Sequence, residues 1–233
     1  MLIAKVAMKK LSSSLLYCTL LVAPLALVAC GKKTVETAPV AVEPAAAPAP
    51  VAAAPSATPP ELTSEQRDMA RKQAKLEYTV MEDKYMSDPR AQWAASATSS
   101  SSYQKGESEA RRATSAIGPI DDKQWRNDQT DIGFDWIELG YAKPVNATEV
   151  RMVIADSATA ESLTKVELQD TDGKWNTIWS GISETKVDER GPRTWLVRSF
   201  EKTAYKVKAV KYTFANTVSV GHKEVEAAQL LGD

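Results

Sequence analysis

Apolar side chains follow two different spacings along the chain, and each spacing predicts one kind of element. In residues 61–87 they recur at steps of three and four, at Ala70, Ala74, Tyr78, Met81 and Tyr85. This period predicts one amphipathic helix within residues 61–90. The segment TSEQ at residues 63–66 has the spacing of a capping box, and no Gly or Pro follows until Pro89. The apolar stripe has two interpretations: it docks on the domain that follows, or it pairs with another chain.

Beyond Trp93 the helical spacing ends and apolar residues alternate with polar ones. The alternating runs cover residues 136–141, 150–154, 165–169, 175–179, 194–200, 205–214 and 224–230. Turn sequences separate them, among them Lys143-Pro144, DTDG at 170–173 and Gly191-Pro192. Short strands with frequent turns and no helices between them predict an all-β, antiparallel β-sandwich over residues 91–233. In this sandwich, Ile137 and Leu139 should face the core.

The first thirty residues have the pattern of an export signal. Residues 1–10 carry three lysines and no acid, residues 15–28 are largely apolar, and the sequence LVAC ends at Cys30. The apolar run is too short and too soon interrupted to span a bilayer. LVAC matches the bacterial lipobox, so we predict a signal peptide at residues 1–29 and diacylation (including palmitate-type chains) of Cys30. The alternative is an ordinary signal peptide that is cleaved elsewhere.

Residues 30–60 are predicted to form a disordered tether. From Thr34 to Pro60 the sequence is almost wholly Ala, Pro, Val, Thr and Glu, with seven of the chain's twelve prolines. Such a composition buries too little apolar surface to order itself. Gly31, rather than Asp, follows Cys30. By resemblance to Gram-negative lipoproteins, this residue predicts a lipid-anchored protein of the outer membrane, on the periplasmic face rather than the cell surface.

Charge and cysteine content exclude several classes of function. Removing residues 1–29 takes away three lysines and no acid, which leaves 26 basic and 30 acidic side chains. This acidic balance predicts no nucleic-acid partner. Cys18 leaves with the signal peptide and Cys30 is acylated, so a disulfide framework is excluded.

Six segments of the second half appear in a characteristic order: SATSSSSY, ATSAIGP, DDKQW, DWIELGYAKPVNATEV, TKVELQDTDGKWNTIWSG and EVEAAQLLG. The series resembles the galactose-binding-domain-like sandwiches, the jelly-roll group that includes discoidin domains, coagulation-factor type C domains and many carbohydrate-binding modules. The resemblance covers residues 93–232, about 60% of the chain. It implies an antiparallel jelly-roll β-sandwich that serves as a non-catalytic binding module.

The resemblance also implies where a ligand and a metal ion would bind. Trp125 lies in the loop region that forms the binding rim of the group, and Arg126, Asn127 and Asp128 beside it are candidate polar partners. Members of the group often hold a structural Ca²⁺, for which the candidate ligands are Asp121, Asp122 and Glu224. In this chain, however, IGPI at residues 117–120 stands where the group commonly has an Asp-Gly turn. The alternative for these acids is solvation on the loops.

No sequence motif of an enzyme is present. The chain lacks a G-x-S-x-G elbow, an H-E-x-x-H pair, a phosphate loop and a dinucleotide fingerprint, and His222 is its only histidine. We therefore predict a non-catalytic envelope lipoprotein that binds carbohydrate, with peptidoglycan or a surface polysaccharide as the glycan. The alternatives are a protein-interaction lipoprotein that docks an envelope partner, and a hydrolase with an unrecognised carboxylate pair.

Overall fold

The computed structural model describes residues 62–103 and 111–233. They belong to one compact unit, Thr58–Asp233. The predicted signal peptide (1–29), the acylated Cys30 and the tether (30–60) lie outside the described residues. Within the described ranges, no helix combines the length and the apolar character that a membrane span requires.

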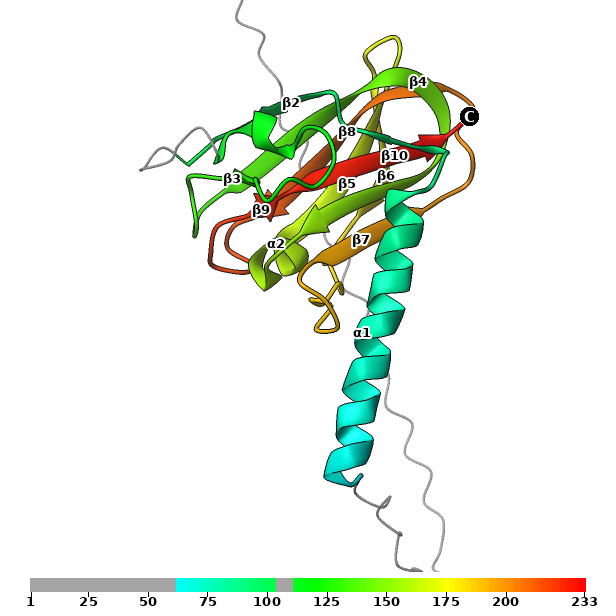
Figure 1. Ribbon diagram of the computed structural model, residues 1–233. Helices are drawn as coiled ribbons and strands as arrows, with labels where there is room; N and C mark the ends of the chain where they lie inside the picture. Colours follow the sequence, from blue (N-terminus) through cyan, green and yellow to red (C-terminus); the bar gives the residue numbers. More distant parts are fainter. Residues whose placement is uncertain (1–61, 104–110) are drawn as a thin grey trace, which may run out of the picture. The chain divides into compact units, whose positions relative to one another are not determined.

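Ten strands build an antiparallel sandwich (Figure 1), which confirms the predicted fold class. They are β1 (Ala91–Trp93), β2 (Ser96–Ser99), β3 (Trp125–Arg126), β4 (Phe134–Ile154), β5 (Leu163–Asp170), β6 (Trp175–Ser180), β7 (Thr194–Ser199), β8 (Lys206–Ala215), β9 (Glu224–Val225) and β10 (Ala227–Gly232). Among the described residues the helices are α1 (Ser64–Met86), α2 (Ser157–Ser162) and a 3₁₀ turn, η2 (Ala113–Ala116).

The long strand β4 takes part in both layers of the sandwich. Its first half, residues 134–140, pairs with β2 and β8, and β8 continues through β5 to β6. Its second half, residues 147–154, pairs with β10 and β7, and β10 continues to β1. The ladder with β8 shifts between Gly140 and Val145, where β4 passes from one layer to the other. A single strand therefore joins the two layers covalently.

Alternation along β4 sends its apolar residues between the layers. The inward residues are fully buried: Ile137, Leu139, Val150, Met152 and Ile154. They join one core cluster with residues of β5, β8 and β10, such as Leu168, Tyr212 and Leu230. The inward direction predicted for Ile137 and Leu139 is confirmed.

Several element boundaries differ from the prediction. Runs 136–141 and 150–154, expected to be separated by a turn at Pro144, form one continuous strand, because the shifted ladder requires no hydrogen bond from the proline nitrogen. Run 224–230 is divided into β9 and β10. β1, β2 and β3 were not predicted, and neither was α2. The strand β2 has the sequence SATS, which carries no alternation of apolar residues.

Helix α1 begins with the predicted capping box and docks on the sandwich through its C-terminal half. Thr63 and Gln66 exchange side-chain to backbone hydrogen bonds of 2.9 and 3.2 Å. Near the other end, Trp195 Nε1 donates to Glu82 Oε1 at 3.3 Å, and Gln229 Nε2 donates to the Tyr85 carbonyl at 3.0 Å. The docking interpretation of the apolar stripe is therefore confirmed for this half.

Tyr78 is the residue of α1 that is buried most deeply, with 3% of its surface exposed. Its hydroxyl donates to Glu82 Oε1 at 3.1 Å. Burial and the adjacent Glu82 carboxylate raise the pKa of Tyr78 to about 12. The ring lies against Gly191, where an added Cβ would overlap the ring atoms.

Replacing Gly191 with alanine should therefore loosen α1. The buried ring has to move to admit the methyl group, and overpacking of this kind costs about 1–3 kcal/mol. We expect Gly191→Ala to lower the free energy of unfolding by that amount and to accelerate amide exchange in residues 78–86. Glu189→Ala, in the same loop and exposed, is the control. Equal exchange rates in the two variants would contradict the docking contact.

Candidate functional site

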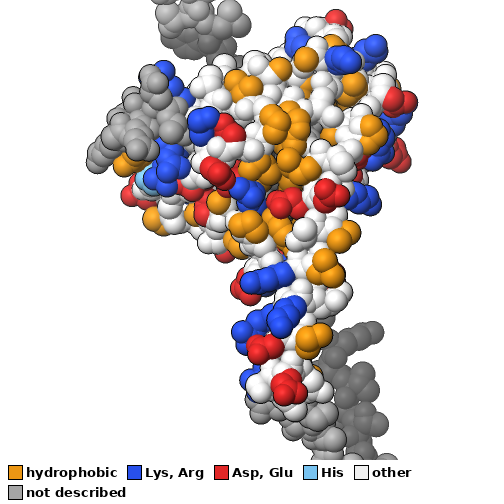
Figure 2. Space-filling model, in the orientation of Figure 1, with side chains coloured by type: hydrophobic (Ala, Val, Ile, Leu, Met, Phe, Trp, Pro, Cys, Tyr) orange, Lys and Arg blue, Asp and Glu red, His pale blue; other side chains and the backbone are white. Residues whose placement is uncertain are grey.

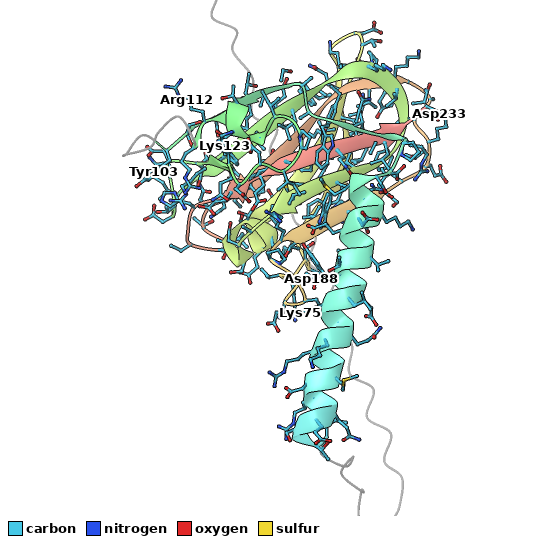
Figure 3. The ribbon with its side chains drawn as sticks, in the orientation of Figure 1. Lys75, Tyr103, Arg112, Lys123, Asp188 and Asp233 are labelled. Carbon is cyan, nitrogen blue, oxygen red and sulfur yellow. The ribbon has the colours of Figure 1, made fainter. Side chains whose placement is uncertain are left out.

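One end of the sandwich gathers loops from distant parts of the sequence around the short ribbon of β3 and β9. In this ribbon Trp125 pairs with Val225, and Arg126 pairs with Glu224. Residues 100–103, 127–133 and 216–223 surround it, and Figure 3 labels Tyr103 at this end, away from the C-terminal Asp233. The rim that the resemblance implied is therefore a real cluster of loops.

A buried carboxylate ties these loops together. Asp135 is only 4% exposed. Its Oδ1 accepts hydrogen bonds from the hydroxyls of Ser100 (2.5 Å) and Ser101 (2.8 Å), and its Oδ2 accepts from the side-chain amides of Asn127 (2.8 Å) and Asn216 (2.9 Å). Burial alone would raise the pKa of Asp135, but these four hydrogen bonds outweigh it and hold the pKa below its usual value. The ionised carboxylate thus fixes three loops relative to one another.

Two of the four predicted ligand-binding residues belong to the interior, which corrects the prediction. Trp125 is completely buried, packs near Phe214 and donates its indole N–H to the Ser101 carbonyl at 2.9 Å. Its ring offers no free face to a ligand. Asn127 is also fully buried, because its side-chain oxygen accepts from the backbone N–H of Lys223 at 2.7 Å while its nitrogen binds Asp135.

The other two predicted residues reach the surface, and two unpredicted residues join them. The guanidinium of Arg126 lies 5.4 Å from the centre of the Tyr103 ring, and the His222 ring meets the same ring edge-on at 5.0 Å. Asp128 is exposed beside them. We call Tyr103, Arg126 and His222 the Tyr103 cluster; all three are partly exposed.

Backbone contacts and an ion pair fix the side chains of the Tyr103 cluster. The N–H of Tyr103 donates to the Arg126 carbonyl at 2.8 Å, and Arg126 forms an ion pair with Glu224. His222 Nδ1 lies 2.9 Å from the Asn127 carbonyl. Because a carbonyl only accepts, Nδ1 carries a proton, and in that tautomer of the uncharged ring Nε2 is an acceptor. The cluster therefore presents a phenol, guanidinium donors and an imidazole acceptor.

The predicted calcium ligands do not come together, which corrects the second site prediction. Asp121 forms an ion pair with Lys123, Asp122 with Arg193 at 3.0 Å, and Glu224 with Arg126. Each carboxylate is therefore matched by a cationic side chain. Within residues 62–103 and 111–233, no three His, Cys, Asp or Glu side chains are grouped as metal ligands.

A buried lysine supplies positive charge inside these loops. Lys223 is fully buried, and its ammonium donates to the carbonyls of Ser219 (2.7 Å) and Gly221 (2.5 Å). Burial lowers the pKa of Lys223, while Asp156 and Asp135 oppose that shift. The carbonyls of Ser219 and Gly221 thus accept hydrogen bonds from the ammonium of Lys223.

Two further tryptophans lie on the outer face of the β2-β4-β8-β5-β6 layer. The Lys211 ammonium lies 4.4 Å from the centre of the Trp136 ring and 4.8 Å from that of the Trp175 ring. Lys211 is also paired across the strands with Glu138 and Glu167. These contacts form the kind of cross-strand ladder that stabilises an exposed sheet face.

Comparisons with known proteins give matches at the level of structure. No protein-family model and no curated protein matches the chain. A family 32 carbohydrate-binding module from Clostridium perfringens, in complex with GalNAc-β-1,3-galactose, is 13% identical, with a TM-score of 0.46 over 59% of this chain and 94% of the module. The family 32 module of Clostridium perfringens NanJ, in complex with galactose, is 11% identical, with a TM-score of 0.46 over 60% and 98%.

A chitosan-binding module from a chitosanase/glucanase of Paenibacillus is also similar. It is 17% identical, with a TM-score of 0.45 over 59% of this chain and 93% of the module. The family 32 modules have the galactose-binding-like β-sandwich, the group that the sequence resemblance named. At these identities and TM-scores the likeness is one of fold, and it assigns neither a ligand nor a binding residue to this chain.

Substitution of Asp135 with asparagine should destabilise the domain. The new amide has one acceptor oxygen and one NH₂ group, so it can no longer accept from all four donors, and the loss of hydrogen bonds to a buried charge costs about 3 kcal/mol. We expect this loss in the free energy of unfolding at pH 7, and a loss within about 0.5 kcal/mol for the exposed control Asp128→Asn.

The pH dependence has a definite sign. Because the pKa of Asp135 is lower in the folded state, its stabilisation is complete above the unfolded value of about 3.9 and is lost as the pH falls through the folded value. The stability difference between the wild-type protein and Asp135→Asn should therefore narrow below about pH 4 in chemical unfolding experiments. A constant difference would mean that Asp135 is not the ionised centre of these loops.

Proposed function

We propose that this chain is a non-catalytic, lipid-anchored protein that binds carbohydrate through the Tyr103 cluster. The observation that carries the proposal is the arrangement at the rim. A partly exposed aromatic ring lies next to a guanidinium and an imidazole, and all three lie on or next to the loops that Asp135 holds in place. This combination differs from the predicted one, since Tyr103 replaces Trp125 as the aromatic group.

The chemistry of the cluster suits a neutral sugar. The apolar C–H groups of a pyranose pack on aromatic rings, and its hydroxyls both donate and accept hydrogen bonds. Arg126 provides donors, and His222 Nε2 provides an acceptor. Glu224 balances the charge of Arg126, so the cluster attracts no anion strongly. The exposed Asp128 adds a carboxylate acceptor for a further hydroxyl.

The cellular part of the proposal rests on the N-terminal sequence. The LVAC sequence ending at Cys30 supports acylation, and two acyl chains provide stable membrane attachment where one does not. The Pro/Ala-rich residues 30–60 would then serve as a tether. Gly31 supports sorting to the outer membrane, where peptidoglycan and surface polysaccharides are the available glycans.

Loss of the Tyr103 cluster should abolish this binding. We expect isothermal titration with galactose, N-acetylglucosamine disaccharide and soluble peptidoglycan fragments to identify at least one ligand of the mature, non-acylated chain. Tyr103→Ala and Arg126→Gln should each weaken its binding tenfold or more, roughly 1.4 kcal/mol. Trp136→Ala, on the outer sheet face, is the aromatic control and should bind normally. No binding by the wild-type chain, or equal losses in all three variants, would refute the assignment.

A second candidate function, protein interaction, is favoured by one observation on α1. Its outward face carries three apolar side chains that are more than half exposed: Met69, Leu76 and Val80. Figure 2 shows such side chains spaced along the helix. Their steps of seven and four residues are those of a helix-pairing seam. This face is separate from Tyr78 and Tyr85, which contact the sandwich.

If α1 pairs with a partner, the contact should be made by the apolar seam of Met69, Leu76 and Val80. Sedimentation of the mature, non-acylated chain should then detect a dimer or a complex with an envelope protein. Leu76→Glu should abolish that assembly, while the neighbouring Lys75→Glu, outside the seam, should leave it intact. A strictly monomeric chain with no captured envelope partner would remove this alternative.

A further inference from the structure

A pocket lies at the open edge of the sandwich, away from the Tyr103 cluster. β6 ends one layer, β7 pairs only with β4 in the other, and residues 181–193 connect the two strands. The pocket has a volume of about 550 Å³. Its lining includes Trp179, Ile182, Glu184, Thr185 and Arg198.

Arg198 enters this pocket from the inner face of β7. In the ladder it stands opposite Val150, and Leu196, two residues before it, belongs to the core. The side chain of Arg198 is therefore directed between the layers. Its guanidinium carbon lies 3.8 Å from the centre of the Trp179 ring.

The guanidinium of Arg198 differs from that of Arg126 in having no acidic partner. Among the described residues, Arg198 forms no ion pair, and its Nε is buried without a hydrogen-bond partner. Stacking on an indole uses only the face of the guanidinium. Its N–H groups lie in the plane and stay available for a planar acceptor with two oxygens.

A buried phenol near Arg198 is unpartnered as well. Tyr212 is fully buried, and its hydroxyl has no hydrogen-bond partner in the part of the chain that the structure describes. Arg198 and Tyr212 interact electrostatically, and burial raises the pKa of the Tyr212 phenol, so the hydroxyl stays protonated. Buried polar atoms are nearly always hydrogen-bonded in folded proteins. Arg198 Nε is a buried, unpartnered atom at the pocket, whereas Tyr212 belongs to the core and not to the lining. The unpartnered donor of Arg198 therefore indicates a site for a ligand with acceptor atoms.

We propose that this pocket binds a carboxylate-bearing sugar of the uronic acid class, with Arg198 holding the carboxylate. Thr185 and the exposed Glu184 would bind the sugar hydroxyls, and the apolar Ile182, 80% exposed, would cover the ring. A simple carboxylate would contact only Arg198, whereas a sugar acid would also contact Thr185, Glu184 and Ile182. The inference rests on the proposed glycan-binding function but assigns a different site and a different ligand charge.

Titration of the full mature, non-acylated chain with sodium glucuronate tests this site. The probes are the Trp179 indole N–H and the Arg198 Nε–H in nuclear magnetic resonance spectra, with glucose and acetate as matched ligands. We expect saturable shifts of both signals with glucuronate, and at least tenfold weaker binding of glucose and of acetate. Equal binding of acetate would overturn the sugar assignment, and equal binding of glucose would overturn the role of the carboxylate. No shift at either signal would overturn the site.

Variants separate this site from the rim. Arg198→Gln should weaken glucuronate binding at least tenfold, and Arg198→Lys, which keeps the charge but loses the planar fork, should weaken it less. Arg190→Gln is the matched control, because Arg190 lies in the neighbouring loop and is already paired with Asp188 at 2.8 Å. Arg126→Gln should leave glucuronate binding unchanged, so failure of the rim and failure of this pocket are distinguishable. Full binding by a folded Arg198→Gln protein would contradict the proposal.

Discussion

The architecture depends on one strand that serves both layers. β4 pairs with β2 and β8 along its first half and with β10 and β7 along its second, so displacement of either half would disturb both sheets. The irregular stretch between Gly140 and Val145 allows this crossing, and Pro144 lies where the ladder requires no donor. The same strand begins at the rim, since Asp135 is its second residue. The core and the functional end of the sandwich are thus parts of one element.

Two buried, charged side chains fix the rim. Asp135 gathers hydroxyl and amide donors, while Lys223 satisfies loop carbonyls only a few residues from the cluster. Burying either charge is unfavourable alone, and it is tolerated because each charge is hydrogen-bonded. The resulting rigidity would favour binding of the proposed sugar ligand. Side chains that are already ordered lose little conformational entropy on binding.

Local sequence patterns predicted most of the secondary-structure elements, but they did not predict which residues form the candidate site. The capping box at Thr63 and the alternation around Ile137 concern residues close in sequence, and both were predicted. The burial of Trp125 could not be predicted, because a tryptophan outside the predicted strands is suited equally to the core and to the surface. The pairing of Arg126 with Glu224 joins residues 98 positions apart. Tyr103 and His222 meet only because β3 pairs with β9, and two-residue strands leave no periodic signal.

The partner of each arginine decides which ligand charge it can serve. Arg126 is paired with Glu224, so the proposed neutral sugar would gain hydrogen bonds there without displacing an ion pair. Among the described residues Arg198 stacks on the Trp179 ring and forms no ion pair, so an anion in the proposed site would supply the missing acceptor. In a partly buried setting this difference is large, because an unpaired guanidinium is costly and its neutralisation is correspondingly favourable. If both proposed sites bind sugars, one sandwich would hold two sugars of different charge, and its affinity for a mixed polysaccharide would exceed that of either site alone.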